Sequence, residues 1–173
     1  MAKNKPVYAF EEADSKKRML LGGKGAGLSE MTRLKLPVPP GFTITTEVCN
    51  KYYDNNRKLP KDVMPAVMKN IAKMEKKTGK KWNSTKNPLL VSVRSGAAIS
   101  MPGMMDTILN LGLNEKTVEG FAEQTKNPRF SWDSYRRFIQ LFGKVVFGVN
   151  DEKFDHVLDS AKEKQGVTDD SKL

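Results

Sequence analysis

The sequence predicts a mixed fold of the α/β or α+β class: a small mixed sheet with flanking helices, followed by a portion made of helices alone. Short apolar runs alternate with helical patterns up to about residue 113, whereas the following residues show only helical patterns. With 173 residues, 38% of them hydrophobic, the chain is long enough to bury a sizeable core. We therefore predict an α/β subdomain at 1–113, part of a helical subdomain at 114–166, and a disordered or truncated end at 167–173.

In the first part, short strands and helices follow one another between turns. Each predicted strand is a short apolar run bounded by turn residues. These runs are residues 7–10, 42–45, 89–93 and 107–111. Helices are predicted over 28–34, after Thr46, and from Pro60 to just before Gly79, where apolar residues recur with helical spacing. In the helix after Thr46, Cys49 is expected as a small core residue.

The second part is predicted as three helices. Asn114, Ser131 and Asn150 are their predicted caps, because Asn and Ser side chains accept hydrogen bonds from the free N–H groups of a first turn. The helix after Ser131 has the strongest apolar stripe of the chain. Gly166 is the predicted stop of the last helix.

The positive charge is confined to the first part. The net charge is +10; residues 1–113 carry 20 Lys and Arg against 9 Asp and Glu, and residues 114–173 carry 10 against 11. Such a field suits a polyphosphate nucleotide or a nucleic acid. Nucleic acid is the less favoured partner, because the lysines from Lys73 to Lys86 surround an apolar helical stripe, and Trp82 is the only aromatic residue among them.

Several classes of protein are excluded by what the composition lacks. No apolar run approaches the roughly 18 residues that span a bilayer, and no signal-peptide core follows Met1–Lys5, so we expect a cytoplasmic protein without a membrane partner. Cys49 and His156 are the only residues of their kinds, which excludes a disulfide framework and a His or Cys metal site. A nucleophile with its base is not found either.

The first candidate site is the stretch Leu89–Thr107. An apolar run, about the length of one buried strand, delivers Arg94 into a loop of small residues, glycines and hydroxyls. A guanidinium is a planar fork of donors, suited to phosphate or carboxylate oxygens, and glycines let backbone N–H groups approach a ligand closely. The alternative is a buried Arg94 that pairs with a structural carboxylate.

The second candidate site is Gly22-Gly23-Lys24-Gly25, which precedes a helical pattern. A glycine-rich entry exposes backbone N–H groups and the positive end of the helix dipole, and Lys24 adds a full charge. The motif is not a Walker A loop, since Lys24 lacks a following Ser or Thr and Arg18 stands where that loop has its first glycine. The alternative is that the glycines allow close helix packing.

Acids that could hold a metal ion beside these cations are absent. Asp106 stands alone after Met104 and Met105, without a second acid in the D-x-E spacing. A phosphoryl-transfer site normally combines cationic side chains with an acid-held Mg²⁺. The chain therefore has the cations of such a site without the residues that hold its metal.

Long motifs in this chain resemble the N-terminal nucleotide-binding region of the pyruvate, phosphate dikinase family. The matching motifs are Gly22–Gly25 with Leu28, Glu30 and Met31, then Pro40–Thr43, Val91–Ala97, Ser100–Leu113, Asn127–Phe130 and Asp133–Gln140. Phosphoenolpyruvate synthase shares the glycine-lysine and Arg-Ser motifs, but the run Met101–Thr107 is more similar to the dikinases. The resemblance extends to about Gly166.

The resemblance implies an ATP-grasp-type domain that transfers a phosphoryl group from ATP to a histidine on a separate domain, which passes it to pyruvate to form phosphoenolpyruvate. It implies that Lys24 and Arg94 contact the ATP phosphates in catalytic roles. It also implies that a loop covers the transferring end of ATP. The binding residues in this loop are Met101, Gly103, Met104, Asp106 and Thr107. The Mg²⁺ ligands are expected outside this chain, so no metal ligand is expected within it.

Three interpretations of the whole chain follow. In the first, it is a fragment of the phosphotransferase that is inactive alone and needs downstream domains or a partner chain to complete its site. In the second, it is a stand-alone truncated relative that acts as an ATP-binding or regulatory module without catalysis. The third, nucleic-acid binding by residues 1–113, ranks below both.

Overall fold

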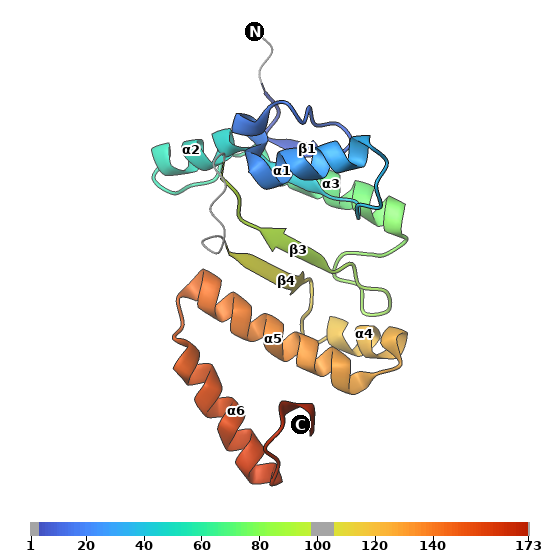
Figure 1. Ribbon diagram of the computed structural model, residues 1–173, viewed down its shortest axis with the longest axis vertical. Helices are drawn as coiled ribbons and strands as arrows, with labels where there is room; N and C mark the ends of the chain where they lie inside the picture. Colours follow the sequence, from blue (N-terminus) through green and yellow to red (C-terminus); the bar gives the residue numbers. More distant parts are fainter. Residues whose placement is uncertain (1–3, 98–105, 173) are drawn as a thin grey trace. The chain divides into compact units, whose positions relative to one another are not determined.

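A computed structural model describes residues 4–97 and 106–172 (Figure 1). Strands and helices alternate in its first part, and helices alone follow β4, which confirms the mixed class predicted from the sequence. The elements in chain order are β1 Val7–Ala9, α1 Arg18–Arg33, β2 Phe42–Ile44, α2 Thr46–Asp54, α3 Val63–Thr78, β3 Val91–Arg94, β4 Thr107–Leu111, α4 Thr117–Thr125, α5 Pro128–Phe147, α6 Asp151–Gln165 and the 3₁₀ turn η1 Asp170–Lys172.

The chain forms two compact units. One consists of Met1–Lys80 with Ser95–Met105, and the other of Lys81–Arg94 with Asp106–Leu173. Each unit contains one two-stranded antiparallel sheet, β1 with β2 in the first and β3 with β4 in the second. Within the mixed class, the described strands thus form two separate ribbons where the sequence predicts one small mixed sheet.

In the first unit, α1 packs against β2 and α3 against β1 of the ribbon, and α2 packs against α1. Val7 and Ala9 of β1 are buried, and α3 lies against this strand. Lysine side chains of α3 pair with acids of the β1–α1 connection, Lys73 with Glu12 and Lys77 with Glu11. Cys49 was expected in the core, but it is exposed, because α2 turns Val48 inward instead.

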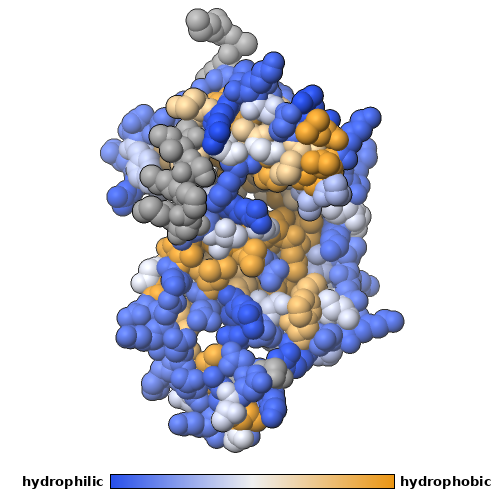
Figure 2. Space-filling view, in the orientation of Figure 1, coloured by the Kyte–Doolittle hydropathy of each residue, from blue (hydrophilic) through white to orange (hydrophobic). Residues whose placement is uncertain are grey.

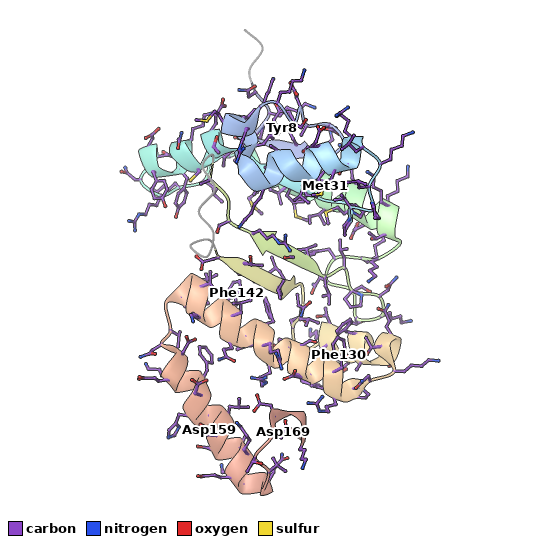
Figure 3. All side chains as sticks on the ribbon, viewed as in Figure 1. Tyr8, Met31, Phe130, Phe142, Asp159 and Asp169 are labelled. Atoms are coloured by element: carbon purple, nitrogen blue, oxygen red, sulfur yellow. The ribbon has the colours of Figure 1, made fainter. Side chains whose placement is uncertain are left out.

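The second unit packs α5 against both β4 and α4. Leu89, Leu113 and Val118 form the apolar part of its core. The prediction of a buried strand before Arg94 is wrong: Val93 is 45% exposed, since β3 pairs with β4 along one edge and the strands are short. Figure 3 shows Phe142 in the half of α5 nearer α6. A row of neighbouring rings runs along this helix through Trp132, Tyr135, Phe138, Phe142 and Phe147.

Two of the three predicted caps act at helix starts. The Asn150 side chain accepts a hydrogen bond from the Glu152 N–H (3.2 Å), and that of Asn114 accepts one from the Thr117 N–H (3.0 Å). Ser131 is not a cap: it is fully buried in the first turn of α5, and Asn127 caps this helix by accepting from the Phe130 N–H.

The surface is largely hydrophilic in the view of Figure 2, with scattered apolar patches. The helices in the described ranges are all too short or too polar to cross a membrane. At the end of the described chain, η1 is attached to the second unit, where Lys162 pairs with Asp170 (2.9 Å) and Arg129 donates to the Asp170 carbonyl (3.1 Å).

Candidate functional site

The glycine-rich segment lies inside α1, where it breaks the helix. Residue 22 has φ 70° and ψ 166°, so a short first turn ends there and a regular helix begins again at Gly23. A positive φ of this kind favours glycine. A Cβ at position 22 would also lie 3.4 Å from the Ala97 carbonyl oxygen. Both the backbone conformation and the close packing therefore favour glycine at this position. The break creates a second helix start in the middle of α1, at Gly23 and Lys24.

The donors at this helix start are engaged by the segment Ser95–Ala97 of the same unit. The ammonium of Lys24 donates to the Ser95 carbonyl oxygen, and the N–H of Gly23 donates to the Ala97 carbonyl oxygen, both at 2.9 Å. Carbonyl oxygens are the neutral counterparts of phosphate oxygens as acceptors. The segment Gly22–Lys24, called the glycine turn below, therefore already donates hydrogen bonds to two oxygen acceptors.

Of the two glycines that follow, Gly25 allows close packing and Gly27 borders open space. A Cβ on Gly25 would lie 2.7 Å from Oγ1 of Thr43 in β2, so Gly25 allows α1 to approach the ribbon. A Cβ on Gly27 would meet no atom within 4 Å. The alternative reading of the motif as a packing device is thus correct for Gly25, while Gly23 and Lys24 face ligand-like oxygens.

Arg94 ends β3 in the second unit, with Thr107 of β4 as its partner in the antiparallel register. These two predicted site residues are therefore brought together by the ribbon. The Arg94 side chain is exposed, and among the described residues no hydrogen bond or ion pair engages it. The alternative of a buried arginine paired with a structural carboxylate does not hold for the described part of the chain.

The remaining predicted residues lie between Arg94 and Thr107 in the sequence. Met101, Gly103 and Met104 lie outside the described residues. Asp106 is exposed and directly precedes β4. Lys24 lies in the first unit and Arg94, Asp106 and Thr107 in the second.

An open pocket of about 800 Å³ runs beside the glycine-rich segment of α1. Its wall carries both signs of charge, with Lys16, Arg18 and Arg33 among its cations. Hydrogen bonds from Arg33 and then Ser15 hold the pKa of Glu30 down at about 2, so this carboxylate is ionised and already paired. With three cations against two acids, Asp14 and Glu30, the wall of the pocket carries a net positive charge.

The described residues contain no ready-made cluster of metal ligands. Residues 4–97 and 106–172 contain no group of three His, Cys, Asp or Glu side chains placed to hold a metal ion. Mg²⁺ takes six oxygen ligands in octahedral geometry, usually one or two carboxylates together with waters and phosphate oxygens. We therefore assign no chemical step in this chain to a bound metal.

Comparison with known proteins matches this chain to one family over most of its length. The family model "Pyruvate phosphate dikinase, AMP/ATP-binding domain" matches residues 18–60 and 55–167. The chain belongs to the pyruvate phosphate dikinase family. It is 57% identical over 167 residues to the pyruvate, phosphate dikinase of Entamoeba histolytica, 53% to that of Clostridium symbiosum and 52%, over 174 residues, to that of Giardia intestinalis.

The alignments cover nearly all of this chain but only a small part of each dikinase. Each alignment covers 96% of this chain, but 19% or 20% of the length of the dikinase. The chain thus spans about a fifth of the relatives that it matches. The family model covers the glycine-rich segment, Arg94 and Thr107 together.

Sequence reasoning missed two features of the site. It treated Arg18 only as a departure from the Walker A pattern, whereas this arginine lies against Gly23: its Nη2 atom is 3.3 Å from the position of a Cβ there. The segment Ser95–Ala97 was read as a loop, yet its carbonyls bind the turn. The position of Arg18 shortly before the glycines was the available signal for its role. The role of the Ser95–Ala97 carbonyls depends on a contact between residues 71 positions apart, for which the sequence has no local signal.

Proposed function

We propose that this chain is the N-terminal part of the nucleotide-binding domain of a pyruvate, phosphate dikinase-like phosphotransferase, and that it binds the phosphates of ATP. In the complete enzyme, the phosphoryl group passes from ATP to a histidine on a separate domain and then to pyruvate. The helical portion beginning near residue 114 is its second subdomain. Membership of the family supports the choice of ATP as the ligand. The contacts of the glycine turn support phosphate binding at that turn.

The single observation that carries this proposal is the occupancy of the glycine turn by oxygen acceptors. Lys24 and the Gly23 N–H each hold one carbonyl oxygen at 2.9 Å. Phosphate oxygens carry more negative charge than carbonyl oxygens, so charge-assisted hydrogen bonds to the same donors are stronger. An ATP phosphate can therefore replace these carbonyls or bind alongside them.

Arg94 is proposed as the second cation for the phosphates, because its exposed guanidinium is unengaged among the described residues. It can bind two oxygens of one phosphate in parallel, which a lysine cannot do. The residues Met101, Gly103, Met104, Asp106 and Thr107 are proposed to cover the transferring end of ATP. Mg²⁺, if bound with ATP, takes its protein ligands from outside this chain.

The test is a calorimetric titration of this chain with Mg-ATP, alongside Lys24→Ala and Arg94→Ala. The exposed Lys69 on α3 supplies a charge-matched control as Lys69→Ala. We expect the two site variants to lose at least about tenfold in affinity and the control to change less than twofold. Equal losses in all three variants, or none, would contradict the assignment. Salt-sensitive retention on nucleic acid that is unchanged in Arg94→Ala would favour the nucleic-acid alternative.

A further inference from the structure

Arg18 is the first residue of α1 and lies directly against the glycine turn. Its Nη2 and Nε atoms are 3.3 Å and 3.6 Å from the position that a Cβ on Gly23 would occupy. The absence of a side chain at Gly23 is what leaves room for the guanidinium there. The Ala97 carbonyl oxygen is 3.7 Å from the same position, so the arginine and the acceptor segment flank one residue.

Unlike the side chains of Lys24 and Arg33, that of Arg18 has no partner among the described residues. Lys24 donates to the Ser95 carbonyl, and Arg33 is bound to Glu30 through Nε (3.0 Å) and a terminal nitrogen. Within residues 4–97 and 106–172, no hydrogen bond or ion pair engages Arg18. A guanidinium has five N–H donors, and within the described part of the chain those of Arg18 are not engaged.

An open pocket lies beside Arg18. The pocket of about 800 Å³ is lined by Arg18, Gly23 and Gly27, and a Cβ on Gly27 would still meet no atom within 4 Å. The carboxylate of Glu30 in the same wall is committed to Arg33 and Ser15. It therefore does not neutralise Arg18.

We propose that Arg18 is a phosphate-binding residue of the nucleotide site, additional to Lys24. This inference rests on the function proposed above and deepens it: Arg18 takes the phosphate chain of the nucleotide through charge-assisted hydrogen bonds, on the pocket side of Gly23. It contributes to binding, and no bond-breaking step is assigned to it.

The experiment compares Arg18→Gln and Arg18→Lys with Arg57→Gln. Arg57 is an exposed arginine of the same unit, in the turn after α2, and it does not line the pocket. Each chain is titrated with ATP and with inorganic tripolyphosphate, which carries the phosphates without the nucleoside. We expect Arg18→Gln to weaken both by about tenfold and to reduce the salt dependence, Arg18→Lys to lose about threefold, and Arg57→Gln less than twofold.

The outcomes separate this inference from the function on which it rests. Wild-type affinity in Arg18→Gln, with affinity lost in Lys24→Ala, would overturn the role of Arg18 and leave ATP binding intact. Equal losses of affinity in Arg18→Gln and Arg57→Gln would show that the loss reflects net charge alone. That result would also overturn the role of Arg18. A wild-type chain that binds neither probe would overturn both. Thermal unfolding of each variant monitors the fold, and Arg18→Lys retains the charge if Arg18→Gln unfolds early.

Discussion

Individual glycines in the segment 22–27 have different tasks, although they look equivalent in the sequence. Gly22 permits the positive φ that breaks α1, and Gly25 permits contact between α1 and Thr43. Gly27 faces open space. Each glycine is therefore expected to respond differently to the addition of one methyl group.

Gly25→Ala and Gly27→Ala test this division directly. In Gly25→Ala, the new Cβ would lie 2.7 Å from Oγ1 and 2.8 Å from Cγ2 of Thr43, so the free energy of unfolding should fall by about 1–3 kcal/mol. Gly27→Ala should raise it by about 0.5–1 kcal/mol, since alanine favours an exposed helix interior. Urea unfolding measures both changes. A Gly25→Ala chain as stable as Gly27→Ala would contradict the close approach of α1 to β2.

Glu30 predicts a pH dependence of stability. Its pKa is lowered from 4.5 to about 2 by Arg33 and then Ser15, so the carboxylate stabilises the fold above pH 4.5 and loses this contribution as pH falls towards 2. Glu30→Gln should therefore unfold at a lower temperature than wild type at pH 7. The difference should narrow progressively below pH 4.5.

The control for this profile is the exposed Glu119, which has no ion pair among the described residues. Glu119→Gln should follow the wild-type melting temperature across the same range. A Glu30→Gln profile that runs parallel to wild type down to pH 2 would show that these hydrogen bonds do not stabilise the fold.

At the scale of elements, α4 packs directly against the backbone of the loop before β3 within the second unit. A Cβ on Gly120 would lie 1.9 Å from the Thr85 carbonyl oxygen, and Gln124 on the same helix donates to the carbonyl of Lys86. The loop before β3 thus lies directly on the helix. Backbone atoms cannot rotate away as the end of a side chain can.

Gly120→Ala should consequently destabilise the chain by about 3 kcal/mol, because α4 or the loop must move. The neighbouring exposed residue gives the control, Glu119→Ala, expected within about 0.5 kcal/mol of wild type. Chemical unfolding of the two variants checks this. If they are equally stable, α4 does not pack on the loop as described.

The helix and strand positions were largely predictable, because local spacing and caps decide them. Asn150 and Gly166 bound α6 as predicted, and β4 spans the predicted residues. Ser131 was mistaken for a cap because a serine before an apolar stripe has the same local signature whether it begins the helix or is buried within its first turn. Strand burial was also misjudged, since an apolar run does not state how many partners its strand has.

For the whole molecule, the sequence motifs predicted the family. The structure adds the hydrogen bonds between the glycine turn and the segment Ser95–Ala97. The sequence alone indicated two phosphate-type segments, one with Lys24 and one with Arg94. It could not show that the residues directly after Arg94 bind the glycine turn, since this contact joins segments that are distant in the chain and uses backbone carbonyls. Side-chain patterns carry no signal for such acceptors.

The central claim is that the glycine turn of α1 binds the phosphates of ATP. Titration of the ¹⁵N-labelled chain with Mg-ATP, followed by amide resonances, tests it most directly. We predict that the resonances of Gly23, Lys24 and Ser95–Ala97 shift together with one dissociation constant, because ATP competes for or adds to the donors that these carbonyls engage. Shifts confined to the lysine-rich face of α3, or no shift at the turn at saturating ATP, would contradict the account.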